Sequence, residues 1–291
     1  MVESSVLADR FEAHRPHLRA VAYRMLGSLA EAEDAVQEAW LRLSRSDVSE
    51  VQNLGGWLTT VVGRVCLDAL RARTSRREDS LEERLPDPVV TGPDRHDPEA
   101  QALLVDSVGL ALMVVLDSLA PAERLAFVLH DTFAVPFEDV AQVVGRSTAA
   151  TKQLAHRARR RVQDAVPPPD PDPGRRRRVV DAFLAASREG DFDGLLTLLD
   201  PDVTLSADRG AALGGLSRLR GAAAVAGQAL TFARFAYSPE PVLVNGAPGV
   251  LSVQDGRPVS LMSLTIRDGV IVAIDILADP DRLSSLLGPT S

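Results

Sequence analysis

A run of basic and polar side chains near the middle of the chain has the residue types that read nucleic acid. Residues 137–162 read FEDVAQVVGRSTAATKQLAHRARRRV. Ala141 is small where two helices must approach, Gly145 suits a tight turn, and Ser147 can cap the helix that follows. On the exposed face of that second helix we expect Thr148, Lys152, Gln153, His156, Arg157 and Arg160.

In a recognition helix, the two ends contact different parts of the DNA. Polar residues near the N-terminus reach base edges, and cations farther along hold phosphates. The pattern therefore predicts a DNA-binding helix-turn-helix. The alternative is an ordinary helical hairpin whose basic face is only solvated.

Two further patterns lie upstream. In EAEDAVQEAWLRL (residues 31–43), Glu31, Asp34 and Glu38 share one helix face with Gln37 beside them, while the opposite side is apolar. Such a face is either a solvated acidic surface or a docking surface for a basic partner helix.

The other upstream pattern is WLTTVVGRVCLDALRARTSRRE, residues 57–78. It predicts a helix with a basic C-terminal end formed by Arg64, Arg71, Arg73, Arg76 and Arg77. These cations could contact phosphates or could complement the helix dipole. Cys66 lies among apolar neighbours and is expected to be a buried small hydrophobe rather than a redox sensor.

Composition and charge restrict the functions that these patterns can have. The 291 residues are 45% hydrophobic, enough for two or three folded domains. We find neither a transmembrane segment nor a secretory signal, and a single cysteine excludes an internal disulfide and a cysteine-based zinc site. A cytoplasmic protein without metal or cofactor is expected. The net charge of −8 disfavours nucleic acid as a partner, but residues 152–161 hold five cations and no acid.

Proline-rich stretches divide the chain. We predict a helical domain (1–78), an acidic proline-rich linker (79–98), a helix-turn-helix domain (99–166), a proline-rich then arginine-rich linker (167–178) and a final domain (179–291). Before the helix-turn-helix, helices are expected over 106–119 and 120–132.

The final domain changes from helical to β-rich. A helix over 179–199, split at Gly190, precedes the runs PVLVNG, GVLSVQ, VSLMSLTI and VIVAIDIL. The strings NGAPG, QDGRP and RDG between the runs are hairpin signals. This order predicts an α+β domain with an antiparallel meander.

Taken together, DAVQEAWLRL, WLTTVVGRVCLDALR and the helix-turn-helix resemble a sigma factor of the extracytoplasmic-function group over residues 1–166. The string STAATKQLAHRARR resembles the subgroup with a C-terminal SnoaL-like domain, a fold similar to the nuclear transport factor two superfamily. The resemblance implies two all-α helical domains, sigma-2-like and sigma-4-like, followed by an α+β cone domain with a curved antiparallel sheet.

The resemblance also implies partners and roles. Core RNA polymerase (β′ and β subunits) and promoter DNA would be the partners, and the C-terminal domain could hold a small-molecule ligand. Asp34, Gln37 and Glu38 would face the coiled coil of the β′ subunit. The implied minus-ten contacts are Asn53, Arg64, Arg71 and Arg73. The implied minus-thirty-five contacts are Ser147, Thr148, Lys152, Gln153, His156, Arg157 and Arg160.

Three strings resemble motifs that would hold the linker against the C-terminal domain. Arg84-Leu85-Pro86-Asp87-Pro88 stands where the subgroup has W-L-P-E-P, Asp208-Arg209-Gly210-Ala211 where it has D-G-G-G, and Asp279-Pro280-Asp281-Arg282-Leu283 where it has N-P-D-K-L. The implied interdomain residues are Leu85, Pro86, Asp87, Pro88, Asp208, Asp279, Pro280, Asp281, Arg282 and Leu283.

The sequence is thus interpreted as an RNA polymerase sigma factor whose activity is modulated by its own C-terminal domain. One alternative is a one-component helix-turn-helix regulator with a ligand-sensing C-terminal domain. A cyclase-like enzyme with a DNA-binding appendage is another. The last domain has no histidine, which leaves Asp208, Asp255, Asp268 and Asp275 as acids or bases, and no catalytic residue is assigned.

Overall fold

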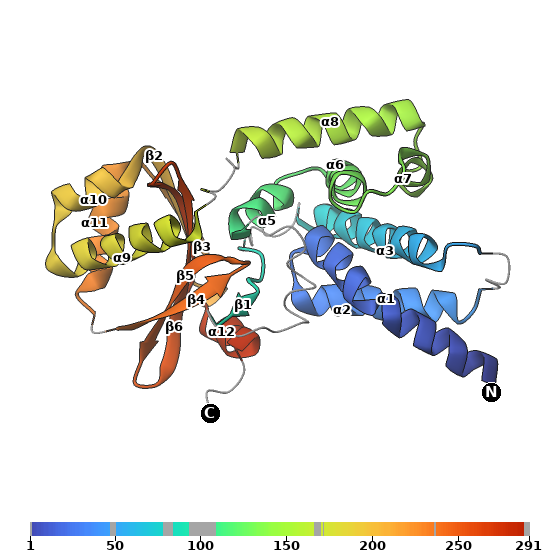
Figure 1. Cartoon of the computed structure of the whole chain (residues 1–291), viewed down its shortest axis with the longest axis horizontal. Helices are drawn as coiled ribbons and strands as arrows, with labels where there is room; N and C mark the ends of the chain where they lie inside the picture. The colour runs from blue at the N-terminus through green and yellow to red at the C-terminus, as the bar shows by residue number, and fades with distance from the viewer. Residues whose placement is uncertain are drawn as a thin grey trace. The chain divides into compact units, whose positions relative to one another are not determined.

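The apolar periodicity of the first 77 residues produces three long helices. The computed structural model (Figure 1) describes residues 2–46, 51–77, 84–92, 109–165, 170, 172–235 and 237–287. It contains α1 (Val2–Leu26), α2 (Leu29–Leu43) and α3 (Leu54–Arg77). Ser28 accepts a hydrogen bond from the Glu31 amide and caps α2, as its sequence position predicts. Leu18, Val21, Met25, Val36, Leu58 and Val62 are fully buried among these helices.

The second helical group contains α5 (Gly109–Asp117), α6 (Pro121–Ala126), η1 (Phe127–Thr132), α7 (Phe137–Val144) and α8 (Thr148–Ala165). The predicted helix over 120–132 is present, but its second half, η1, is a π-helix. Its widened turn is closed by Phe133 N–H donating to the Val128 carbonyl at 3.2 Å. Residues 106–108 and 166, predicted as helix ends, lie outside the described residues.

The chain forms two units. One is Met1–Leu81, Pro98–Asp106 and Met113–Val166; the other is Glu82–Asp97, Ser107–Leu112 and Pro167–Ser291. Apart from the first residues of α5, up to Leu112, the two helical groups that we predicted as separate domains therefore lie in one unit. The described part of the acidic linker, residues 84–92, belongs with the C-terminal residues instead.

The second unit is a seven-stranded sheet with order β1-β4-β5-β6-β7-β2-β3. Its strands are β1 (Val90–Thr91), β2 (Leu199–Asp208), β3 (Leu216–Arg220), β4 (Ser238–Val244), β5 (Ala247–Gln254), β6 (Arg257–Arg267) and β7 (Val270–Leu277). Strands β4 to β7 form the predicted antiparallel meander. The predicted antiparallel sheet is present, and the pairing of β2 with β7 is parallel.

Two-residue turns close the three hairpins of the meander. Asn245-Gly246, Asp255-Gly256 and Asp268-Gly269 all adopt positive φ, between 49° and 85°. Both central residues of a type I′ turn need this conformation, which Asn, Asp and Gly tolerate best. The hairpins predicted from NGAPG, QDGRP and RDG are thereby confirmed, and turn geometry accounts for Asp255 and Asp268.

Helices cover one face of this sheet (Figure 1). They are α9 (Pro173–Glu189), α10 (Phe192–Leu198) and α11 (Ala222–Ala233), while α12 (Pro280–Leu287) contacts β6. Phe183, Leu195 and Val225 pack against Leu205 and Ile274 in the core. The split predicted at Gly190 is present, because this glycine ends α9 with φ 77°.

The start of α9 differs from our prediction. It begins at Pro173, so Pro173–Arg178, predicted as linker, forms its first turns. Asp172 accepts a hydrogen bond from the Gly174 amide, and a proline with preset φ is favourable at the first helical position. Asp172-Pro173 is therefore a helix-start signal. We had assigned it to the linker because the surrounding sequence is rich in proline.

A buried joint connects the two helical groups within the first unit. Arg124 is 1% exposed, donates from Nε to the Arg24 carbonyl at 3.0 Å, and pairs through Nη1 with Asp117 at 3.0 Å. The Arg24 guanidinium lies over the Phe133 ring, 5.3 Å from its centre. A Cβ on Gly63 would stand 3.0 Å from Leu129, so α3 and η1 approach closely there.

Replacing Arg124 by alanine should destabilise the first unit by about 3 kcal/mol, because the Arg24 carbonyl and the half-buried Asp117 carboxylate lose their buried partner. Arg159→Ala is the control, since Arg159 pairs with Asp131 at the surface and should cost at most about 1 kcal/mol. Urea unfolding followed by Trp fluorescence measures both, because the two tryptophans, Trp40 and Trp57, lie in this unit. Equal losses would contradict a structural role for the joint.

Candidate nucleic-acid and partner-binding surfaces

The predicted helix-turn-helix is formed by α7 and α8. Gly145 ends α7 with φ 73°, where an added side chain would be strained. The Ser147 hydroxyl accepts a hydrogen bond from the Ala150 amide at 3.2 Å and so caps α8. Val140 and Leu154 are buried between the helices. The turn, the helix cap and the core packing predicted from the sequence are therefore present with the expected geometry.

Most of the predicted minus-thirty-five side chains are exposed on α8. Lys152, Gln153, His156, Arg157 and Arg160 are all exposed. Arg157 also pairs with Glu123 at 2.7 Å, and Lys152 lies over the Phe137 ring at 5.6 Å from its centre. These contacts hold two cations in place on the outer face of the helix without burying them.

The acidic face of α2 keeps its expected orientation. Asp34 and Gln37 are exposed, and Glu38 pairs with Arg42 on the same helix at 2.9 Å. Leu41 is 45% exposed and follows Asp34 by seven positions, so it extends the same face. The predicted polymerase-binding residues thus surround an exposed apolar side chain that sequence reasoning did not select, although its spacing would have indicated it.

The start of α3 holds Asn53 in a fixed orientation. Its Oδ1 atom accepts a hydrogen bond from the Gly56 amide at 2.9 Å, which caps the helix. A Cβ on Gly56 would lie 2.8 Å from the Asn53 Nδ2 atom, so glycine leaves room for the folded-back amide. Asn53 is nevertheless exposed.

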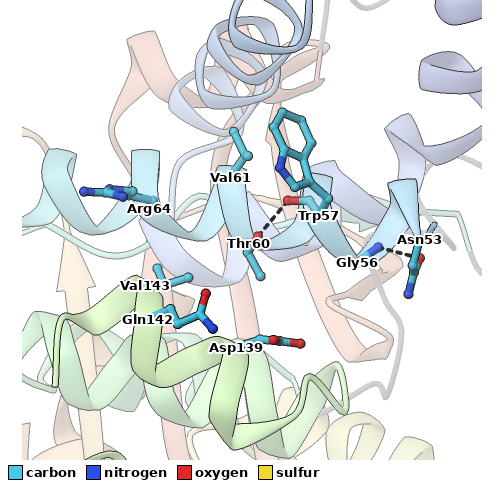
Figure 2. Close-up of a pocket in the computed structure, with 9 residues that line it drawn as sticks. All are labelled: Asn53, Gly56, Trp57, Thr60, Val61, Arg64, Asp139, Gln142 and Val143. Carbon is cyan, nitrogen blue, oxygen red and sulfur yellow. Dashed lines mark hydrogen bonds between the residues drawn. The ribbon is translucent and has the colours of Figure 1, made fainter. Parts of the chain in front are cut away.

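A cavity of about 400 Å³ lies beside Asn53 (Figure 2). One wall is α3, with Gly56, Trp57, Thr60, Val61 and Arg64. The facing wall is α7, with Asp139, Gln142 and Val143. Arg64 has no hydrogen-bond or ion-pair partner among the described residues. The structure therefore places two of the predicted minus-ten residues, Asn53 and Arg64, at one cavity.

The other two predicted minus-ten residues lie elsewhere. Arg73 donates to the Leu26 carbonyl at 3.0 Å and forms an ion pair with Glu31, so it joins α3 to both neighbouring helices. Arg71 is exposed and lies 3.9 Å from Asp68. Arg73 is thus tied into the helical unit, whereas Arg71 remains at its surface.

In the second unit, the three linker-motif strings meet around Asp208. This carboxylate is 2% exposed; its Oδ2 atom accepts bonds from the Leu85 amide at 2.9 Å and from Arg282 at 2.7 Å. Arg282 also donates to the Leu85 carbonyl and to Asp87, both at 2.7 Å. We name this arrangement the linker clamp: Leu85, Asp87, Asp208 and Arg282.

The remaining motif residues support the clamp. Asp279 caps α12 by accepting bonds from the amides of Asp281 and Arg282, which directs Arg282 toward the linker. Leu283 is buried, as are Pro86 and Pro88. Gly210 has φ 77°, and a Cβ there would lie 2.5 Å from Asp279. Gly210, the glycine that the D-R-G-A string retains, therefore lies where the close contact with Asp279 leaves no room for a side chain.

Sequence reasoning missed a second attachment of the linker. Val89 and Asn245 exchange two hydrogen bonds: the Val89 amide donates to the Asn245 side chain at 3.0 Å, and the Asn245 amide donates to the Val89 carbonyl at 2.8 Å. Strand β1 then pairs with β4. The sequence predicted Asn245 only as a turn residue. The turn signal gave no indication that Asn245 also binds the linker.

Asp275, another of the candidate acids, is buried on the sheet. It lies on β7 opposite Ser206 and Ser263, on the face that does not carry the helix-packed Ile274. Burial raises its pKa to about 6, opposed by a hydrogen bond with Ser206 and by the charge of Arg218. Burial likewise raises the pKa of the Cys66 thiol to about 12, as expected for a buried cysteine.

Among the described residues, no helix is both long and apolar enough to cross a membrane. Within the same residues, His, Cys, Asp and Glu side chains form no group of three that could hold a metal ion.

Comparisons with known proteins cover both units. Family models for Sigma-70 region 2 and Sigma-70, region 4 match residues 10–76 and 109–162. The chain is similar to the ECF RNA polymerase sigma factor SigJ of Mycobacterium tuberculosis (43% identity over 95% of this chain and 93% of that protein). Its similarity to the probable ECF RNA polymerase sigma factor SigI of that species is 34% over 98% of both. The crystal structure of SigJ matches with a TM-score of 0.75 and 38% identity, over 98% of this chain and 100% of that one.

Removing the Asp208 carboxylate should release the linker. In Asp208→Ala, the Leu85 amide loses a charged acceptor, a bond of roughly 1.5–3 kcal/mol. Its hydrogen exchange should therefore accelerate about ten- to hundredfold, and the Val89 amide, held by Asn245, should change less. Asp202→Ala on the same strand is the control, because Asp202 pairs with Arg220 only at the surface. Unchanged Leu85 exchange would contradict the clamp.

Proposed function

Because the chain belongs to the extracytoplasmic-function RNA polymerase sigma factors, we propose that its helical unit brings core RNA polymerase to a specific set of promoters. Similarity to SigJ over almost the whole length of both proteins carries this conclusion. The helical unit contains the two sigma-70 regions, and the second unit is the SnoaL-like domain. Core RNA polymerase and promoter DNA would be its partners, and its site of action would be the cytoplasm.

The acidic face of α2 is suited to hold the polymerase. Asp34 and Gln37 project into solvent, and their charge suits a basic helical surface such as the β′ coiled coil. Exposed Leu41 on the same face adds an apolar contact that would be desolvated on binding. The rest of the helical unit would contact the β subunit.

Promoter recognition would be divided between α8 and α3. The exposed stripe of Gln153, His156 and Arg160 on α8 suits the major groove at the minus-thirty-five element. Asn53, which caps α3, and Arg64 on α3 suit the minus-ten strand, where an extruded base needs a pocket. Arg71 remains available for phosphate, whereas Arg73 would contribute by fixing α3 in place.

The linker clamp is the route by which the C-terminal domain would modulate activity. The linker joins the two sigma-70 regions in the sequence, and the clamp fixes it to the C-terminal domain through buried hydrogen bonds. A small-molecule ligand of that domain could act through the same strands. No observation favours catalysis or the one-component regulator over this function.

Charge reversal on α2 tests the polymerase contact. Asp34→Arg and Glu38→Arg should each reduce co-elution with core RNA polymerase at least tenfold, because like charges then oppose each other across the interface. The matched control is Asp9→Arg, an exposed acid on α1, which should bind normally. Failure of the unmodified chain to bind polymerase would contradict the function and favour the one-component regulator.

Transcription tests the role of the clamp. Asp208→Ala should change promoter output at least threefold in a reconstituted assay, while polymerase binding through α2 stays intact. Asp202→Ala again serves as the matched substitution. Equal output from all three proteins, together with accelerated Leu85 exchange in Asp208→Ala, would show that the clamp has no regulatory effect.

A further inference from the structure

A cluster of four consecutive arginines, Arg175–Arg178, lies at the start of α9 in the C-terminal unit. The Arg178 side chain is 73% exposed and the Arg175 side chain 51%. Three positions separate these two residues, so they share one face of the helix. The Arg177 side chain is 39% exposed. Neither the linker clamp nor the promoter contacts proposed above include these cations, so their role is open.

The acids beside the cluster hold its two outer cations only loosely. Arg178 Nη2 lies 3.6 Å from Asp172 Oδ2, and Arg177 Nε lies 3.4 Å from Asp181 Oδ1. Both distances exceed the separation of about 2.7–2.9 Å that is typical of a charge-assisted hydrogen bond. Both carboxylates are more than half exposed, and such surface ion pairs add little stability. A phosphate group can therefore replace either carboxylate at small cost.

Asp170, which follows the end of α8 by five residues, is anchored on the sheet of the C-terminal unit. It is 7% exposed, its amide donates to the Ile266 carbonyl at 3.1 Å, and its Oδ2 atom lies 3.4 Å from Arg175 Nε. Arg175 also donates to the Asp268 carbonyl at 3.1 Å. A Cβ on Gly269 would lie 2.7 Å from Arg175 Nη2, so this glycine leaves room for the guanidinium. We name Asp170, Arg175, Asp268 and Gly269 the hairpin anchor.

The hairpin anchor limits how far the arginines can lie from the recognition helix. Helix α8 ends at Ala165, and the five residues from there to Asp170 span at most about 18 Å when fully extended. Arg160, a proposed DNA contact, precedes Ala165 by five helical residues, or about 7.5 Å along the axis. The chain path from Arg160 to Asp170 is therefore at most about 25 Å, less than one turn of DNA at about 34 Å. Because Arg175 contacts Asp170 directly, the arginine cluster begins within that reach.

From this charge and this reach we propose that Arg177 and Arg178 bind phosphates of the DNA duplex beside the minus-thirty-five element. The planar guanidinium matches phosphate oxygens with two parallel N–H donors. Contacts of this kind fix position and add affinity but carry no base sequence. The C-terminal unit thereby adds to promoter binding without changing which promoters are chosen. The inference rests on the proposed function, since it requires that α8 bind the duplex.

The salt dependence of promoter binding tests these contacts. The full-length chain with core RNA polymerase is measured on the promoter where the unmodified chain initiates best. Arg177→Ala/Arg178→Ala should bind roughly fivefold more weakly at about 0.1 M salt, and the slope of log affinity against log salt should fall by about two, one for each phosphate contact. The matched control is Arg188→Ala, an exposed arginine near the other end of α9, which should change neither quantity.

A longer linker separates phosphate contact from a structural role of the two arginines. About twenty Gly and Ser residues inserted after Pro168 leave Arg177, Arg178 and the hairpin anchor in place but extend their reach from α8. A longer tether lowers the effective concentration of the arginines at the DNA, so the insertion should weaken promoter binding about threefold. In Arg177→Ala/Arg178→Ala the same insertion should have no further effect.

Two results would overturn the phosphate contact and leave the proposed function intact. One is equal affinity and equal salt slope in Arg177→Ala/Arg178→Ala and Arg188→Ala. The other is an insertion that weakens binding equally with and without the two arginines. Absence of promoter binding by the unmodified chain with polymerase would instead overturn the proposed function and, with it, the inference.

Discussion

One carboxylate organises the attachment of the linker. The Asp208 side chain is almost fully buried and accepts hydrogen bonds from a linker amide, from Arg282 and from the Gly210 amide. Arg282 in turn reaches the Leu85 carbonyl and Asp87. A buried charge is tolerated only when its hydrogen bonds are made, so the carboxylate, guanidinium and backbone must be present together. The differences from the W-L-P-E-P motif leave these polar contacts intact, because Asp87 keeps a carboxylate where the motif has Glu and Leu85 contributes through its backbone.

The helical unit separates two kinds of DNA surface. On α8 the polar and basic stripe is solvated, whereas the Asn53–Arg64 segment of α3 faces α7. The Arg124 joint and the missing side chain at Gly63 allow this close approach.

Local chemistry explains what the sequence could predict. Ser28, Ser147, Gly145 and the Asx-Gly turns act on their immediate neighbours, and each has the predicted geometry. Contacts between distant segments were not predictable: the parallel pairing of β2 with β7, the Val89–Asn245 exchange, and the position of α7 on α3. For β2 a signal existed, since Val203, Leu205 and Ala207 alternate with polar residues and are buried. The partner-binding and DNA-binding roles of the site residues remain predictions.

The linker of the sigma regions folds as part of the C-terminal unit, and this has a consequence in polymer terms. While residues 84–91 are held, they do not contribute contour length to the connection between the two sigma regions. Local unfolding of the C-terminal unit would return them to the tether, and a longer flexible tether lowers the effective concentration of one region at the other. The folding equilibrium of the C-terminal unit would therefore affect how often the two sigma regions encounter each other.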